Sequence, residues 1–84
     1  MFKDLDNWEY ENNAISRTFE FSSYLSGVSF LTKVASLADE LNHHPDMTLS
    51  WCKVHIVLTT HDSGDVTDKD VALAKLCDQH FKLD

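Results

Sequence analysis

The longest periodic pattern in the sequence is a helical one, and it ends before Pro45, the only proline of the chain. Ser22 or Ser23 can cap its start. Because proline cannot continue a helix and restricts the residue before it, we expect the helix to end near Asn42. Apolar residues recur at helical spacing, first in Tyr24, Val28, Leu31, Ala35 and Ala38, and then in a widening set of Phe30, Val34, Leu37 and Leu41.

Strand-like alternation of apolar and polar residues flanks this helix on both sides. Four strands are expected, at residues 8–11, 15–21, 47–52 and 53–60. Asn12-Asn13 separates the first two strands and predicts a tight hairpin, because asparagine tolerates positive φ. After a turn at residues 62–65, a last helix is expected with its apolar stripe at Leu73, Leu76, Cys77 and Phe81.

The order β-β-α-β-β-α predicts an α+β sandwich. We expect a four-stranded antiparallel sheet with helices on one face, formed by residues 1–84 as a single domain. Gly27 lies within the apolar stripe, where a missing side chain would let the helix approach the sheet closely. Arg17 shares the apolar face of its strand, so its stem should lie along the sheet edge with its charge in water. Thr67, three residues before Asp70, forms a loose capping box.

Size and composition narrow the class of protein. A chain of 84 residues has a thin core, so self-association as a homodimer or homotetramer is expected. The net charge of −7 argues against direct nucleic-acid binding. Cys52 and Cys77 are far apart, which predicts two reduced thiols rather than a disulfide or a zinc site. With neither a membrane-spanning run nor a secretory signal in the sequence, we expect cytoplasmic residence.

Three histidines gather around the expected helix end and strand end. His43 and His44 precede Pro45, and His61 follows the expected fourth strand. Pro45 pushes His44 out of helical geometry, so the adjacent rings can project into one pocket. Since imidazole titrates near neutrality, such a cluster suits proton transfer in both directions.

With these positions the chain resembles the pterin-4a-carbinolamine dehydratase family, also known as the dimerisation cofactor of a homeodomain transcription factor. The resemblance covers about Trp8 to Phe81. Its pattern is met by Asp39, His43, His44, Pro45, Trp51, His61 and Asp70, with Lys53–Ile56 leading into Leu58–Asp62. Members usually carry a helix before the first strand, but only residues 1–7 are available, so we expect it to be missing or very short. Lys69 stands where an arginine is often found, and Asn42 where some members have Asp.

The resemblance implies dehydration of a 4a-hydroxytetrahydropterin to quinonoid dihydropterin in tetrahydrobiopterin recycling, without a metal or redox cofactor. It implies His43, His44 and His61 as the catalytic set. We expect His43 and His61 to be the acid–base pair, His44 to orient the pterin, and Asp39 to fix the tautomer of His43. The expected substrate contacts are Asn42, His43, His44, Thr59, Thr60, His61 and Asp62.

Simpler structural interpretations stand beside these assignments. The histidine doublet alone is typical of a helix C-cap. Asp39 is equally compatible with a solvated carboxylate, and Asp62 with a cap for the following turn. For Trp51, a packing role is favoured over stacking on the pterin. His55 is expected on the outer face of the sheet or at an interface. His80 is expected to be structural, and a zinc site is disfavoured because adjacent ligands are uncommon.

An alternative function is a protein-interaction module that acts as a dimerisation cofactor or transcriptional coactivator, in the nucleus as well as the cytoplasm. Phe30 and Leu37, taken to flank the buried stripe, are the residues expected to make such contacts or to mediate self-association. A third alternative is action on another reduced pterin or in molybdopterin metabolism. The intact histidine set favours the enzyme, because binding alone would not require it.

Overall fold

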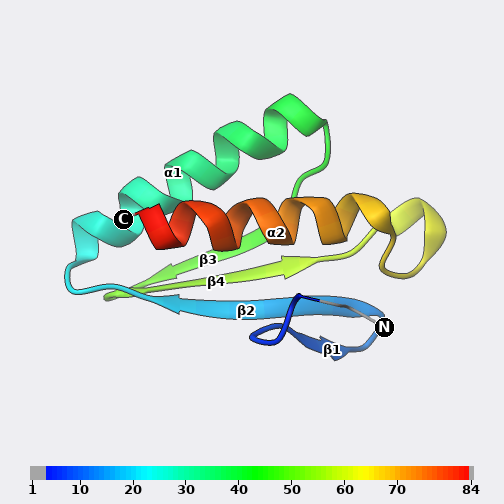
Figure 1. Cartoon of the computed structure of the whole chain (residues 1–84), viewed down its shortest axis with the longest axis horizontal. Coiled ribbons are helices and arrows are strands. Elements are labelled where there is room, and N and C mark those ends of the chain that lie inside the picture. The colour runs from blue at the N-terminus through cyan, green and yellow to red at the C-terminus, as the bar shows by residue number, and fades with distance from the viewer. Residues whose placement is uncertain (1–3, 84) are drawn as a thin grey trace.

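A computed structural model describes residues 4–83, which form a four-stranded antiparallel sheet and two long helices (Figure 1). The elements are β1 (Glu9–Glu11), β2 (Ala14–Glu20), α1 (Tyr24–Leu41), β3 (Asp46–Ser50), β4 (Lys53–Leu58), the short 3-10 helix η1 (His61–Ser63) and α2 (Asp68–Leu83). The strand order is β1-β2-β4-β3, and both helices lie on the same side of the sheet. The predicted fold class and element order are confirmed.

The segment before β1 forms turns in its described part, residues 4–8, and residues 1–3 lie outside the described residues. Residues 4–8 therefore contain no helix, as expected. Leu5 and Trp8 from this segment are buried in the core. The Trp8 ring meets Phe19 edge-on, with the ring centroids 6.0 Å apart. The short segment thus covers part of the core without helical structure.

Two-residue turns join the strands of both hairpins. Asn12 and Asn13 have φ values of 54° and 63°, which confirms the tight turn predicted for this pair. The β3–β4 ladder closes at Ser50 and Lys53, so residues 51 and 52 form a turn and both strands are shorter than predicted. Trp51 projects from this turn with 80% of its surface exposed. The prediction that Trp51 is a packing residue is therefore wrong for this chain.

Helix α1 begins and ends as predicted, and its buried line lies within the predicted apolar stripe but not at the expected centre. The Ser23 hydroxyl accepts a hydrogen bond from the Ser26 N–H (3.1 Å), and Asn42 ends the helix at φ 51°. The buried line is Gly27, Phe30, Val34 and Ala38, whereas Tyr24 is exposed and Val28, Leu31 and Ala35 are half-buried. Of the line predicted first, only Ala38 is fully buried, and the other four residues lie toward the flank. Phe30 is only 1% exposed, so its predicted role as a surface contact is wrong.

The core lies between the sheet and the two helices. Phe19 on β2 is at its centre, with ring centroids 4.8 Å from Phe30 of α1 and 5.0 Å from Phe81 of α2. Leu73 and Cys77 of α2 are fully buried, and Leu76 and Phe81 are half-buried, which agrees with the stripe predicted for this helix.

Arg17 does not extend its charge into water, and that prediction is wrong. Its Nη1 donates to Asp78 Oδ1 of α2 at 2.6 Å, and its guanidinium lies 4.3 Å from the centre of the Phe19 ring. The Trp8 Nε1–H donates to the same carboxylate at 3.0 Å. The carboxylate from α2 compensates the cation, so Arg17 can remain at the edge of the core instead of reaching solvent.

Candidate active site

The loops that carry the histidines leave the same end of the sheet (Figure 1). His43 and His44 lie between α1 and β3, and His61 follows β4. Since β3 and β4 are antiparallel and Asp46 pairs with Val57, the start of β3 lies beside the end of β4. The topology therefore brings together two segments that are distant in the sequence.

A buried carboxylate holds the His43 ring. His43 Nε2 lies 2.5 Å from Oδ1 of Asp70, whose side chain is 0% exposed. A carboxylate accepts hydrogen bonds, so the Nε2–H of His43 is the donor. Neutral imidazole has one ring proton, and placing it on Nε2 leaves the lone pair on Nδ1. The contact thus selects the ring nitrogen that can exchange a proton with a substrate.

The second oxygen of Asp70 is held from two other elements. Asp70 Oδ2 accepts hydrogen bonds from the Thr60 hydroxyl (2.7 Å) at the end of β4 and from the Thr67 N–H (2.9 Å) before α2. The bond to the Thr67 N–H is one half of the predicted capping box. Three donors thus satisfy the two oxygens of this fully buried carboxylate.

Asp39 pairs with His44 rather than with His43. His44 Nε2 lies 2.8 Å from Asp39 Oδ1, and the two side chains are 59% and 82% exposed. The predicted contact between Asp39 and His43 fails because α1 ends at Leu41. Asn42 then takes the left-handed conformation, so His43 no longer follows Asp39 by one helical turn. Asp39 is in position to orient the His44 ring instead.

Of the remaining predicted site residues, Thr59 and Asn42 lie outside the His43 network. Thr60, His61 and Asp62 lie in this network or next to it along the chain. Thr59 is turned away from the His43 network, because its hydroxyl donates to the carbonyl of Asn13 (2.7 Å). Asn42 is an exposed helix cap. His61 and Asp62 are exposed in η1, directly after Thr60, and the His61 carbonyl accepts from the N–H of Gly64 (3.1 Å). The network thus includes His43 and Thr60, with His61 and Asp62 next to it along the chain.

A cleft of about 310 Å³ adjoins this network. It is lined by Thr60, Asp62, Ser63, Thr67, Asp68 and Lys69. Thr60 and Thr67 therefore contribute both to the cleft and to the hydrogen bonds around Asp70. Charges of both signs surround the opening.

The loop beside the cleft is tied to the first hairpin. The Tyr10 hydroxyl donates to Asp65 Oδ1 at 2.7 Å, and the Val66 N–H donates to the same atom at 2.7 Å. The bond from Tyr10, followed by that from Val66, lowers the pKa of Asp65, and in return the carboxylate raises the pKa of Tyr10. Backbone pairing of Thr60 with Asp65 closes the loop from the other side.

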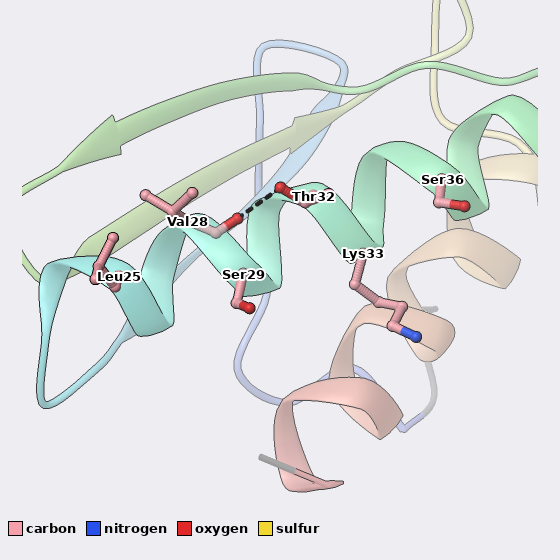
Figure 2. Close-up of a pocket in the computed structure, with 6 residues that line it drawn as sticks. All are labelled: Leu25, Val28, Ser29, Thr32, Lys33 and Ser36. Atoms are coloured by element: carbon pink, nitrogen blue, oxygen red, sulfur yellow. Dashed lines mark hydrogen bonds between the residues drawn. The ribbon is translucent and has the colours of Figure 1, made fainter.

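A second hollow, of about 540 Å³, lies along α1 (Figure 2). Its lining is Leu25, Val28, Ser29, Thr32, Lys33 and Ser36. Lys33 is the one titratable group of this lining, so it offers no acid–base pair. We therefore place the candidate active site at the histidine loops, although this hollow is larger than the cleft there.

Other polar groups of the described residues fit structural roles. His55 lies on the outer sheet face as predicted, with Nδ1 2.8 Å from the Thr18 hydroxyl. His80 is half-buried on α2. Cys52 and Cys77 are both free. Across residues 4–83 we find no cluster of three or more His, Cys, Asp or Glu side chains arranged to hold a metal ion.

Neither helix in the described part of the chain combines the length and apolar character that a bilayer crossing requires.

The sequence did not reveal that Asp70 holds the His43 ring in this site. Asp70 was predicted only as half of a capping box and as a position of the family pattern. Its contact with His43 spans 27 residues of sequence. The available signal was an acidic residue in the first turn of a helix that follows the loop after His61.

The sequence matches the family described as pterin 4 alpha carbinolamine dehydratase over residues 1–80. The chain belongs to this family. A relative from Natronomonas pharaonis is 49% identical over 72 residues, covering 86% of this chain and 78% of the relative. A relative from Thermomicrobium roseum is 39% identical over 75 residues, covering 89% and 81%. Both carry the name "Putative pterin-4-alpha-carbinolamine dehydratase".

Solved structures of the pterin dehydratase fold agree with this membership. A Brucella melitensis protein described as a transcriptional coactivator/pterin dehydratase superposes with a TM-score of 0.85 at 29% identity, covering 88% of this chain and 81% of its own. A pterin dehydratase-like protein described as a RuBisCO assembly factor of the alpha-carboxysome has a TM-score of 0.71 at 23% identity, covering 86% and 83%. The second likeness concerns the fold alone. Membership in the family supports a pterin-carbinolamine dehydratase activity in general.

Proposed function

We propose that this chain dehydrates 4a-hydroxytetrahydropterins to quinonoid dihydropterins by histidine acid–base catalysis. The observation that carries the proposal is the His43 ring held against the buried carboxylate of Asp70 (2.5 Å). In this reaction the C4a–O bond breaks and the hydroxyl leaves as water after gaining a proton. N5 loses its proton, and a double bond forms between C4a and N5. The elimination changes no oxidation state overall, so an acid and a base are sufficient.

We assign His43 as the base and His61 as the acid. When His43 accepts the N5 proton at Nδ1, its ring becomes a cation, and the adjacent Asp70 carboxylate stabilises that cation. His61 lies on a different loop and can approach the leaving hydroxyl from another direction. Well-placed acid and base groups of this kind typically contribute about 10²–10⁴-fold each.

The remaining predicted residues are proposed to bind the pterin. His44, oriented by Asp39, lies next to His43 and can contact the ring system. Asp62 lines the cleft and can accept hydrogen bonds from the donor-rich pyrimidine edge. Thr60 also lines the cleft. Because the Thr59 side chain is bonded to Asn13, a contact from Thr59 would use its backbone.

A stopped-flow assay with a synthetic 4a-hydroxytetrahydropterin tests the proposal. His43→Ala and His61→Ala, made separately, are each expected to slow dehydration by about 10²–10⁴-fold. His55→Ala is the matched control, because His55 lies on the outer sheet face. Rates equal to wild type in both site variants would exclude the assignment.

The domain organisation, the metabolic role and the oligomeric state of the chain are also proposed from its membership in the family. Residues 1–84 would act as one domain, in tetrahydrobiopterin recycling, and as a homodimer or homotetramer. Sedimentation analysis tests the oligomeric state in a measurement separate from the activity assay.

A protein-interaction role is the second candidate function. It is supported by the description of the Brucella protein as a coactivator and by the exposure of Leu25 and Trp51. Replacing both with serine should weaken self-association or partner binding while leaving dehydration intact. Unchanged sedimentation and unchanged binding to a transcription factor would argue against this role.

A further inference from the structure

The hydrogen bonds around the Thr60 hydroxyl have only one consistent direction. Thr60 Oγ1 lies 2.7 Å from Asp70 Oδ2 and 2.7 Å from Thr67 Oγ1. An ionised carboxylate has no proton to give, so Thr60 donates to Asp70. Its single proton is then used, and Thr67 must be the donor between the two hydroxyls. The bonds therefore run from Thr67 to Thr60 to Asp70.

The orientation of the Asp70 carboxylate depends on this chain of bonds. Oδ1 faces His43, whereas Oδ2 is held by the Thr60 hydroxyl and by the Thr67 N–H at 2.9 Å. Asp70 is fully buried, so the loss of a donor leaves one of its oxygens with fewer hydrogen bonds. Without the Thr60 hydroxyl, one donor would remain at Oδ2. The carboxylate would then be free to rotate, and this rotation would alter its contact with His43.

The same hydroxyl pair also closes the base of the loop that carries His61. Thr60 ends the segment after β4, and Thr67 precedes α2, so their contact joins the two ends of residues 61–66. The Thr60 N–H adds a bond to the Asp65 carbonyl at 3.1 Å. The Thr60 side chain therefore connects the His61 loop with the Asp70–His43 pair, beside the backbone N–H of Thr67.

We propose that Thr60 is a positioning residue for the acid–base pair. Its hydroxyl, fixed by Thr67, keeps Asp70 aimed at Nε2 of His43 and so leaves Nδ1 available to the substrate. The relevance to catalysis rests on the function proposed above, whereas the effect on the His43 ring does not.

Thr60→Val tests this role because valine keeps the β-branched shape and removes the hydroxyl. In protein labelled with ¹⁵N-histidine, neutral His43 should carry its proton on Nε2 in the wild type and shift toward Nδ1–H in Thr60→Val. The kcat for dehydration should fall roughly 10- to 100-fold. Thr60→Ser, which retains the hydroxyl, should restore both. Thr18→Val is the control, since it removes a hydroxyl 2.8 Å from His55 on the outer sheet face.

An unchanged His43 tautomer in folded Thr60→Val would overturn the proposal. Should that variant not fold, Thr67→Val replaces it, because it removes the donor to Thr60 and retains the backbone N–H that binds Asp70. A smaller shift in the same direction is expected there, and no shift would again overturn the proposal. A tautomer shift in a protein without dehydratase activity would support the role of Thr60 and reject the function proposed for the chain.

Discussion

The orientation of individual side chains in this protein depends on neighbours that are distant in sequence. The His43 ring is oriented by Asp70, and that carboxylate is in turn held by Thr60 and Thr67. A positioned imidazole exchanges protons through one chosen nitrogen, whereas a free one presents either. Asp70 therefore has as large a part in the proposed chemistry as the histidine itself.

The two cysteines differ in environment, and this difference can be measured. Burial, with the nearby Asp78 charge as a lesser cause, raises the pKa of Cys77 from 9.0 to about 12. Near pH 8 this lowers the thiolate fraction of Cys77 about a thousandfold relative to an ordinary thiol. Mass spectrometry after iodoacetamide treatment should therefore find Cys52 modified well before Cys77. Equal rates in the native protein would contradict the burial of Cys77, and equal rates in urea are the control.

The same pKa shift has a consequence for stability at high pH. Below pH 9.0 the thiol is protonated in both the folded and the unfolded chain. Between 9.0 and about 12 the unfolded chain loses its proton first, so this residue's contribution to stability declines as pH rises.

At the scale of elements, the ends and turns follow from local residue chemistry, whereas the buried faces depend on packing. Ser23 and Asn42 bound α1, and the two asparagines form the first turn. The face that α1 buries is set by its contact with the sheet. There, a Cβ on Gly27 would lie 3.6 Å from Leu49, Phe21 and Val54.

Gly27→Ala is therefore expected to stabilise the protein. The added methyl group would meet its neighbours at ordinary contact distances, and alanine favours the helix by roughly 0.5–1 kcal/mol over glycine. The free energy of unfolding in urea should rise by about this amount. Gly64→Ala is the contrasting variant, because Gly64 has φ 69° and alanine there should cost about 1 kcal/mol. A loss of stability in Gly27→Ala would contradict the packing of α1 described here.

The link between the first hairpin and the loop after His61 predicts a change in titration. Tyr10→Phe removes the main cause of the low pKa of Asp65, so that pKa should rise toward its ordinary value of 3.8. In the wild type, the contribution of Asp65 to stability is present above pH 3.8 and is lost as pH falls through its lowered value. An NMR titration of the Asp65 side chain checks this, with Tyr24→Phe as the control. An unchanged Asp65 titration in Tyr10→Phe would show that the bond does not form in solution.

At the scale of the whole molecule, one carboxylate joins three parts of the chain. Asp78 of α2 accepts hydrogen bonds from Arg17 of β2 and from Trp8 before β1. The N-terminal segment, the sheet and the last helix thus meet at one partly buried charge.

Asp78→Ala should therefore destabilise the fold much more than the loss of an exposed ion pair. Removing one partner leaves the Arg17 cation partly buried without its carboxylate, which should cost about 2–3 kcal/mol. Asp39→Ala removes the exposed contact with His44 and should change stability by less than about 0.5 kcal/mol. Urea denaturation of both variants provides the comparison. Similar losses in the two would contradict the anchoring role of Asp78.

The order of elements and the location of the site could be predicted from sequence because both depend on local patterns. Hydrophobic periodicity, the asparagine turn and Pro45 gave the element order, and the spacing of the histidines indicated the family. The pairings of Arg17 with Asp78 and of His43 with Asp70 span 61 and 27 residues, and no local pattern encodes them. The centre of the buried stripe of α1 differs from the prediction for a related reason, since the sheet rather than the helix determines which line of the stripe is buried.

The central claim, that His43 and Asp70 act as one unit, is tested most directly by a double-mutant cycle. Single-turnover dehydration rates would be measured for the wild type, His43→Gln, Asp70→Asn and the double variant. In Asp70→Asn, the Thr60 and Thr67 donors should retain the amide oxygen, so the amide N–H₂ would face His43 and impose the wrong tautomer. We predict a loss of about 10²–10⁴-fold in each single variant and no further loss in the double variant. Losses that multiply, or a wild-type rate in His43→Gln, would contradict the account.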